Sequence, residues 1–517
     1  MHDQQADQYL KGIWMHAPSR RLTGQILVDA KLLVDAKIVG PENALKPLCV
    51  DLDGTLVRTD SLIEGILSIL SRRNGIANLV KAFTWSRAAL KRNVAVLANC
   101  SPELLPYNTE LIAYLREMKS KGHRLILATA ADARVAQMVA DHVGLFDDVI
   151  ACDGINNLKG EAKARELVRR FGKKGFAYAG NDRDDLAVWL EADGIIIVNA
   201  SSGVVRKTRS LGRVVAEFQD QPPKVITALR AMRPHQWVKN LLVFVPLLTS
   251  QSFTDWPGFL GALLMFASFC AAASGIYLAN DLMDLEADRR HPRKRNRPFA
   301  SGALELTFGI DLAALLLAVS VALAAAAGAV HMILAYAAIS LGYSLALKQY
   351  PVLDVFILAA LYTLRIVAGG IASLHPASLW LLAFAGFLFL SLALVKRCSE
   401  LPRDLRDSNV VNVRRGYCIG DRPLLVMFGV GSAFASSVVL ALYVGSTTAV
   451  QQYQSPEVLW SLVPLSLFWQ LRLWLSTERG NMHDDPIVYA SRDWVSRLVA
   501  TGVVAIVLLA SWGVRFW

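Results

Sequence analysis

Two sets of aspartates, far apart in this chain, have spacings that are typical of sites where phosphate groups bind or react. The first, in "KPLCVDLDGTLV", follows an apolar run and places Asp51 and Asp53 two residues apart. If the run is a strand, both side chains extend to the same side, and the carboxyl ends of parallel strands are where α/β active sites form. A carboxylate approaches a phosphate dianion only where a cation and a lysine offset the repulsion. The pair therefore predicts a phosphoryl-transfer site, with a simple turn or helix cap as the alternative.

The second set, in "NDLMDLEADRRHPRKRNRPFASG", follows a long apolar run and contains Asp281, Asp284 and Asp288. Their spacing puts three carboxylates on one face of a helix, over about 10 Å. Such acids repel one another unless a divalent cation lies between them, and Mg²⁺ usually completes its shell with water and phosphate oxygens. The basic residues that follow would bind the remaining phosphate charge. The stretch therefore predicts a Mg²⁺-diphosphate site at a membrane surface, in preference to a solvated charged loop.

The composition indicates two unlike halves. The chain has 517 residues, of which 54% are hydrophobic and 19% charged, with a net charge of +11, and it is too long for one ordinary core. Up to about Lys224 it has the pattern of a soluble protein, and beyond that point apolar runs follow one another. We assign the positive charge to membrane topology and anionic lipid, not to nucleic acid. The six scattered cysteines and the absence of an evident cleavable signal predict reduced thiols and a cytoplasmic first domain.

In the soluble half, two further apolar runs are candidate strands. The stretches "HRLILATAADARV" and "GFAYAGNDRDDLAVW" contain strand ends near Thr129 and Asn181, with helical stretches between them. This alternation predicts an α/β fold with a doubly wound parallel sheet. The helical insert at about 61–103 is expected to form a small cap over the site. We expect this domain over residues 45–215 and a linker over 216–230, and we leave residues 1–44 unassigned.

Apolar windows of about twenty residues predict an all-α polytopic membrane bundle over residues 231–517. Nine spans are expected, near 237–254, 257–279, 305–326, 328–347, 353–374, 377–396, 423–446, 457–475 and 496–514. Lysines and arginines gather in the loops after the second and sixth spans, and Lys348 follows the fourth. The basic residues of the loop after the sixth span include Arg403, Arg406, Arg414 and Arg415. This positive-inside pattern places the amino-terminal domain and the active-site loops in the cytoplasm, in a multi-pass protein of a bacterial-type inner membrane.

The ordered set of DxDGT, a strand-end Thr, a Lys and GNDxxD resembles the haloacid dehalogenase superfamily of phosphatases over residues 45–215. The resemblance implies that Asp51 is the nucleophile and that Asp53 is the general acid and base. Thr129 and Lys163 would hold the phosphoryl oxygens, with Lys159 as a less suited stand-in for Lys163.

The same resemblance implies a Mg²⁺ site in this domain. The ion would bind Asp51, the carbonyl of Asp53 and the acidic loop with Asn181 and Asp185. The family usually has an acid where this chain has Asn181. Because an amide oxygen ligates Mg²⁺ more weakly than a carboxylate, Asp182 or Asp185 would then contribute.

The NDxxDxxxD motif resembles the UbiA superfamily of intramembrane prenyltransferases, over about residues 229–517. That family usually carries a second motif, DxxxD; here "LKQYPVLDVF" offers Asp354 with no acid four residues later, so the second metal site is incomplete. The stretches "MRPHQWVKNLLVFVPLL", "HPRKRNRPFASG", "LVKRCSEL" and "RRGY" look like the decaprenyl-phosphate phosphoribosyltransferase branch. That branch implies transfer of a 5-phosphoribosyl group from phosphoribosyl pyrophosphate to a polyprenyl phosphate, with release of pyrophosphate.

The resemblance also implies a set of binding residues in the membrane half. Mg²⁺ and the diphosphate would lie on Asp281, Asp284 and Asp288. Substrate groups would be bound by further polar residues: Lys239, Asn280, Lys294, Arg295, Arg297, Tyr343, Lys348, Asp354, Arg365, Lys396 and Arg397. Tyr343, like Tyr417, fits the role less well, since an aromatic residue at a membrane interface is more often an anchor.

Three functions remain open at this point. The leading hypothesis is a bifunctional membrane enzyme, in which the phosphatase removes the 5-phosphate of a lipid-linked phosphoribose. The alternative is prenyl transfer from a prenyl diphosphate to an aromatic or other small acceptor. A lipid- or ion-binding protein or transporter is the third, and the collection of polar residues at one membrane surface argues against it. We expect Mg²⁺ in both domains, a lipid substrate and the membrane as partners, and no nucleic acid; no oligomeric state is predicted.

Overall fold

The computed structural model describes residues 45–401 and 416–513, apart from 73, 84–85, 99–100, 253 and 483–484. The unassigned segment 1–44 lies outside the described residues. So do Arg403, Arg406, Arg414 and Arg415, four of the basic residues predicted to face the cytoplasm.

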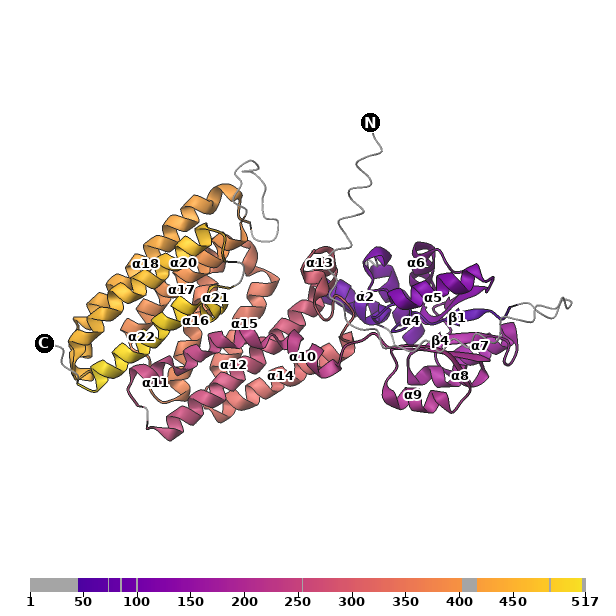
Figure 1. Cartoon of the computed structure of the whole chain (residues 1–517), viewed down its shortest axis with the longest axis horizontal. Coiled ribbons are helices and arrows are strands. Elements are labelled where there is room, and N and C mark those ends of the chain that lie inside the picture. Colours follow the sequence, from indigo (N-terminus) through magenta and orange to yellow (C-terminus); the bar gives the residue numbers. More distant parts are fainter. Residues whose placement is uncertain are drawn as a thin grey trace, which may run out of the picture. The chain divides into compact units, whose positions relative to one another are not determined.

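The amino-terminal domain is built on a six-stranded parallel sheet with the order β3-β2-β1-β4-β5-β6 (Figure 1). The strands are β1 (Leu48–Val50), β2 (Leu125–Asp132), β3 (Asp148–Cys152), β4 (Ala177–Gly180), β5 (Gly194–Val198) and β6 (Arg213–Phe218). The strand order reverses at β1, which pairs with β2 on one side and β4 on the other. The predicted doubly wound parallel sheet is confirmed, and a reversal of this kind is where such sheets place their ligands. The sheet ends at Phe218, beyond the expected domain boundary at residue 215.

Helices cover both faces of this sheet because its central strands are apolar on both sides. Leu48 and Val50 of β1 pack in one cluster with helices α5 (Thr109–Ser120) and α6 (Ala133–Val143). Cys49, between them, packs in the opposite cluster with α7 (Glu161–Phe171) and α8 (Leu186–Glu191). The remaining helix of this domain's second half is α9 (Ser202–Arg209). The two-sided burial fixes the register of β1, and with it the position of Asp51 at the strand's carboxyl end.

The stretch expected to be a cap forms three helices: α2 (Ser61–Leu70), α3 (Gly75–Ala82) and α4 (Arg87–Leu97). Asp60 caps α2 by accepting from two backbone N–H groups, and Ser86 caps α4. Ile69, Ala82 and Val94 join the three helices in a small buried cluster. These buried residues pack against one another, whereas Ile76, Val80 and Phe83 of the same stretch are exposed.

The membrane half contains seven described helices that are long and apolar enough to cross a bilayer. They are α12 (Trp256–Met283), α14 (Leu306–Ala326), α16 (Leu353–Ala372), α17 (Leu379–Glu400), α18 (Arg422–Val444), α20 (Leu462–Glu478, extended by a 3₁₀ turn from Pro456) and α22 (Trp494–Ser511). Their side-by-side packing is visible in Figure 1, where α12 lies along α14 and α17 along α18. The chain is thus an integral membrane protein.

The nine predicted spans are not reproduced in the described residues. The expected span at 328–347 corresponds to α15 (Val330–Leu345), whose 16 residues cover about 24 Å, less than the hydrocarbon thickness of a bilayer. The expected span at 237–254 is a 3₁₀ helix, η4 (Pro234–Phe244), followed by the short α11 (Val245–Thr249). Local apolarity predicted a span here, although the segment contains buried Lys239 and Asn240.

Close backbone contact fixes η4 against α16. A Cβ atom on Gly369 of α16 would lie 2.0 Å from the carbonyl oxygen of Val243, so only glycine allows this approach, as is common between helices in membranes. The contact brings the polar residues of η4 beside those of α16. Between the predicted domains, α10 (Lys224–Met232) occupies part of the expected linker.

Candidate functional site

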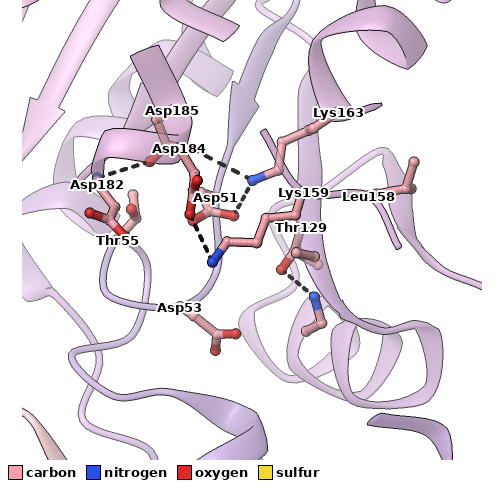
Figure 2. A network of polar contacts seen from close by, with 12 residues as sticks. Asp51, Asp53, Thr55, Thr129, Leu158, Lys159, Lys163, Asp182, Asp184 and Asp185 are labelled. Carbon is pink, nitrogen blue, oxygen red and sulfur yellow. Dashed lines mark hydrogen bonds and ion pairs between the residues drawn. The ribbon is translucent and has the colours of Figure 1, made fainter. Parts of the chain in front are cut away.

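The amino-terminal site lies at the carboxyl ends of β1, β2 and β4. Asp51 and Lys163 are buried, and the Lys163 Nζ lies 2.7 Å from Asp51 Oδ1. Lys163 also donates to the hydroxyl of Tyr178 at 2.8 Å, whereas Lys159 pairs with Asp184 at 2.7 Å. Figure 2 shows Lys163 directed toward Asp51 and Lys159 joined to Asp184. The sequence preference for Lys163 over Lys159 agrees with this geometry, because only Lys163 makes a direct ion pair with Asp51 among the described residues.

The two predicted carboxylates, Asp51 and Asp53, differ in pKa. Burial raises the pKa of Asp51 to about 6, although Lys163 opposes this increase. Burial, followed by the carboxylates of Asp60 and Asp51, raises the pKa of Asp53 to about 8. Asp53 accepts hydrogen bonds from the N–H and hydroxyl of Ser61, at 2.9 and 3.0 Å. At neutral pH Asp53 therefore keeps a proton and Asp51 is mostly ionised, which is the division needed for a general acid beside a nucleophile.

The loop after β4 is organised by Asp185. Its Oδ1 accepts from the Tyr178 hydroxyl at 2.7 Å, and its Oδ2 accepts from the backbone N–H groups of Asn181 and Asp182 at 2.9 and 3.1 Å. Asn181 in turn accepts from the Thr55 hydroxyl at 3.2 Å. Asp185, predicted as a metal ligand, thus uses both oxygens to shape the loop, and Asn181 lies against the loop that follows β1.

Gly54 makes this approach possible. Its φ of +74° favours glycine, and a Cβ here would lie 2.2 Å from Asn181 Nδ2 and displace that amide. On the other side of the site, Thr129 is buried, and its hydroxyl accepts from the N–H of Ala131 at 3.0 Å. The predicted site residues near the ends of β1, β2 and β4 therefore lie in one cleft.

In the membrane half, the predicted continuous helix face is wrong. Helix α12 ends at Met283, Asp284 leaves the helical conformation, and α13 (Leu285–Arg290) follows. Asp281 and Asp288 nevertheless remain together, because Arg297 Nη1 lies 3.1 Å from the first and 2.6 Å from the second.

Arg233 is a second cation beside this pair of aspartates. Its Nη2 contacts both oxygens of Asp281, at 2.7 and 2.8 Å, and its guanidinium lies 5.1 Å from the Tyr277 ring centroid. The backbone of Arg233 has a φ of +55°, a strained conformation for a non-glycine residue and one that is frequent at functional sites. The sequence analysis missed Arg233, although it stands in the quoted stretch "MRPHQW".

The acidic pair fits Mg²⁺ in a limited way. Within the described residues, no three His, Cys, Asp or Glu side chains converge as a metal cluster. However, Asp288 Oδ1 is buried without a hydrogen-bond partner, and Mg²⁺ is commonly held by one or two carboxylates together with water and substrate oxygens. Asp288 and Asp281 therefore suit an ion that arrives with a phosphate.

A second polar cluster, which the sequence analysis also missed, surrounds Asp485 just before α21 (Pro486–Arg492). Asp485 is buried and lies 2.7 Å from Lys239 Nζ and 3.2 Å from Lys396 Nζ. Burial raises its pKa, but the two ammonium groups outweigh burial and hold the pKa below its ordinary value. The Tyr362 hydroxyl donates to the same carboxylate at 3.0 Å.

A cavity of about 250 Å³ lies beside this cluster and reaches Arg233. Its lining residues are Arg233, Gln236, Lys239, Tyr277, Lys396, Ser399, Glu400 and Asp485. Since Arg233 also binds Asp281, one continuous polar site extends from the acidic pair to the two lysines.

Arg365 lies next to this site and is held by neutral groups. Its Nε donates to Asn240 Oδ1 at 2.8 Å. The rings of Phe269, Tyr336 and Tyr362 surround its guanidinium, with centroids 4.8 to 6.0 Å away. Cation–π contacts of this kind stabilise a buried guanidinium without a carboxylate.

Other predicted residues form a separate buried network. Arg397 Nε lies 2.8 Å from Asp354 Oδ2, and Tyr417 donates to the other oxygen at 2.6 Å. Arg397 also donates to the Tyr343 hydroxyl at 3.2 Å. Asp354 is thus neutralised internally. The remaining predicted residues are half-buried or exposed: Asn280, Lys294, Arg295 and Lys348.

The sequence profile of the UbiA prenyltransferase family matches residues 241–491. The uncharacterized protein y4nM of Sinorhizobium fredii is 34% identical over 472 residues, which cover 90% of this chain and 91% of that protein. The chain belongs to the UbiA family through its carboxyl-terminal part. This UbiA region is also similar to the decaprenyl-phosphate phosphoribosyltransferase of Corynebacterium glutamicum, with 38% identity over 189 residues, 35% of this chain and 57% of that protein.

Two solved structures illustrate the two halves. A UbiA homolog from Archaeoglobus fulgidus bound to GPP and Mg²⁺ covers 55% of this chain and 99% of its own, with 18% identity and a TM-score of 0.43. A substrate-bound phosphoserine phosphatase covers 35% of this chain and 95% of its own, with 15% identity and a TM-score of 0.25. The UbiA region is a transferase of that superfamily, and the amino-terminal domain has haloacid dehalogenase-like phosphatases among its structural neighbours.

Proposed function

We propose that the UbiA region transfers a 5-phosphoribosyl group from phosphoribosyl pyrophosphate to a polyprenyl phosphate. The observation that carries this proposal is the continuous polar site, in which Arg233 joins the Asp281–Asp288 pair to the two lysines around Asp485. The similarity to decaprenyl-phosphate phosphoribosyltransferases supports it. In the reaction, the C1–diphosphate bond breaks, an acceptor phosphate oxygen bonds to C1, and pyrophosphate leaves.

The charges favour this reaction over prenyl transfer to a neutral acceptor. A prenyl diphosphate brings one anionic group, whereas this donor and acceptor together bring a diphosphate, a 5-phosphate and a lipid phosphate. Arg233 and Arg297 would bind the diphosphate directly, and Asp281 and Asp288 would hold the Mg²⁺ that arrives with it. Bound Mg²⁺ would neutralise that leaving group, in its Lewis-acid role. The lysines around Asp485 supply a second cationic subsite for another phosphate, which a neutral acceptor does not need.

The amino-terminal domain is proposed to be a phosphatase that removes the 5-phosphate from the lipid-linked product. Asp51 would attack the phosphoryl group, and Asp53 would protonate the leaving oxygen. Asp53 would then take a proton from the water that hydrolyses the phosphoaspartate and releases phosphate, while Lys163 and Thr129 would hold phosphoryl oxygens. Asp51, the Asp53 carbonyl and Asn181 would hold Mg²⁺, which offsets the repulsion between nucleophile and phosphate. For this coupling, the domain over about 45–215 and the acidic loop must face the cytoplasm, as the positive-inside pattern predicts.

Pyrophosphate release tests the transferase proposal. Detergent-purified full-length protein is given Mg²⁺, phosphoribosyl pyrophosphate and a polyprenyl phosphate. We expect lipid-dependent release that falls at least about 100-fold in Asp281→Asn, because a buried carboxylate that orients Arg233 and would hold the metal is worth several kcal/mol. Asp311→Asn, on an exposed position of α14, is the control and should retain the rate. Turnover of a prenyl diphosphate in place of this reaction, or equal rates in both variants, would overturn the proposal.

A further inference from the structure

Helix α4 of the cap presents two basic side chains to the phosphatase cleft. Arg87 and Lys91 are four residues apart, so they lie on one face of the helix. Both line the cleft that also contains Asp51, Thr129 and Lys163. None of the roles assigned above to the nucleophile, the acid or the phosphoryl-holding residues uses them.

The charge of Lys91 is not compensated by a carboxylate. Its Nζ donates to the carbonyl of Ala130 at 2.6 Å and to Asn157 Oδ1 at 3.0 Å, which are both neutral acceptors. An ammonium group has three N–H donors, so one remains for a ligand. Ala130 directly follows Thr129, which places the ammonium at the edge of the phosphoryl site. Across the described residues, neither Lys91 nor Arg87 has an ion pair.

This charge exceeds what a simple phosphate monoester needs. The phosphoryl group already has Lys163, Thr129 and the proposed metal, and Lys163 is balanced by Asp51 at 2.7 Å. Two further cations that face the cleft without acidic partners favour a second anion on the substrate. Leu90 and Val94, which also line the cleft from α4, add an apolar surface for the organic part of such a substrate.

We propose that Arg87 and Lys91 form a second anion subsite, which selects phosphate monoesters carrying a phosphodiester elsewhere on the same sugar. The inference rests on the proposed phosphatase function and narrows its substrate class. A lipid-linked 5-phosphoribose has this arrangement, with a monoester at one end of the sugar and a phosphodiester at the other. A purely structural alternative is that Lys91 fixes the closed cap through Ala130 and Asn157.

Two soluble esters distinguish these alternatives. Ribose 5-phosphate and its 1-(methyl phosphate) diester share the monoester, and only the second carries the additional anion. Phosphate release by the full-length protein with Mg²⁺ gives kcat and KM for each. We expect Lys91→Gln and Arg87→Gln each to raise the KM of the diester about tenfold, the value of a lost charge-assisted hydrogen bond, without changing kcat or the kinetics of ribose 5-phosphate. Lys91→Arg should retain the preference.

Arg92→Gln is the matched control. Arg92 is the next residue on α4, donates to the Asp153 carbonyl at 2.7 Å, and does not line the cleft. We expect it to leave the preference for the diester unchanged. Equal effects of Lys91→Gln on both esters would overturn the subsite in favour of a cap-fixing lysine, and unchanged kinetics for both would overturn it outright.

A binding measurement separates this inference from the phosphatase proposal itself. Equilibrium dialysis with an Asp51→Asn variant measures the affinity for each ester and does not require hydrolysis. Tighter binding of the diester, lost in Lys91→Gln, supports the subsite even if the wild-type protein hydrolyses neither ester. Equal affinity for both esters refutes the subsite, whatever the hydrolytic activity.

Discussion

Asn181→Asp tests whether the loop after β4 contributes to the proposed Mg²⁺ site of the amino-terminal domain. The two side chains have the same shape, so the hydrogen bond from Thr55 and the fit over Gly54 are retained. The substitution adds one negative charge and leaves the geometry in place. If Asn181 is a ligand, the charged oxygen should bind Mg²⁺ more tightly than the amide oxygen does.

The expected gain follows from charge and exposure. Asn181 is only partly buried, so screening is close to that of water, where unit charges 4 Å apart interact by about 1 kcal/mol. A divalent ion doubles this to about 2 kcal/mol, and repulsion from the neighbouring Asp51 removes about half. A net gain of about 1 kcal/mol corresponds to a roughly fivefold increase in Mg²⁺ affinity.

A Mg²⁺ titration of p-nitrophenyl phosphate hydrolysis, with calorimetric titration of the same protein, measures this change. We expect half-saturation at about one fifth of the wild-type Mg²⁺ concentration. Asn157→Asp adds the same charge to the cleft but beside Lys91, and it should change the Mg²⁺ affinity far less. An unchanged or weaker affinity in Asn181→Asp would refute the reasoning and remove Asn181 from the metal site.

Three further substitutions test the remaining charge arrangements. Arg297→Gln removes the cation shared by Asp281 and Asp288 and should lower kcat/KM for pyrophosphate release about 10- to 100-fold. Arg297→Lys should recover little of this loss, because one ammonium group cannot reproduce the bridging guanidinium. Asp485→Asn leaves the buried Lys239 and the half-buried Lys396 without their carboxylate. It should destabilise the UbiA region by about 3–5 kcal/mol, seen as a lower thermal midpoint in detergent; an unchanged midpoint would contradict the buried Lys239–Asp485 pair. The pKa of Asp53 is about 8 in the folded domain and about 3.9 in an unfolded chain. Between about pH 4 and 8 the folded state therefore binds one proton that the unfolded state has lost. The free energy of unfolding without Mg²⁺ should fall with rising pH over this range, by up to about 1.4 kcal/mol per pH unit. Urea unfolding of the full-length protein in EDTA, followed by proteolysis of the domain, should show this slope, and Asp53→Asn should remove it.

The parts of the fold that were predictable are those that depend on local sequence patterns. Apolar runs that end in polar residues predicted three of the six strands, β1, β2 and β4, and their parallel pairing brings Asp51 and Thr129 into one cleft. Thr129 lies within β2, which continues to Asp132, and β3, β5 and β6 were not predicted. Lys163 was placed by resemblance, and its 2.7 Å contact with Asp51 agrees. The helix break at Asp284 was not predictable, because the spacing of acids indicates which face they share only if the helix continues.

The parts that were missed depend on contacts between distant segments. Arg233 binds Asp281 from a separate helix, and Asp485 approaches Lys239 from near the end of the chain. A periodicity reports which side of an element is apolar, not which polar groups meet across the fold. The same limitation explains the excess of predicted spans: composition marked 237–254 as apolar, while the buried Lys239 and Asn240 of its 3₁₀ helix belong to the polar site.

The incomplete second acidic motif is compatible with transfer from a diphosphate because of how the charges balance. Asp281 and Asp288 are matched by Arg233 and Arg297, whereas the Asp485 cluster has two lysines for one carboxylate. Glu400 lines the same cavity, so the four cations of the polar site are matched by four carboxylates before any metal binds. Asp354, the remnant of the second motif, is paired with a buried arginine and has no charge to offer a second ion. In the proposed reaction the two lysines would therefore donate hydrogen bonds to one phosphate, and Mg²⁺ arriving with the diphosphate would supply the positive charge that the leaving group needs.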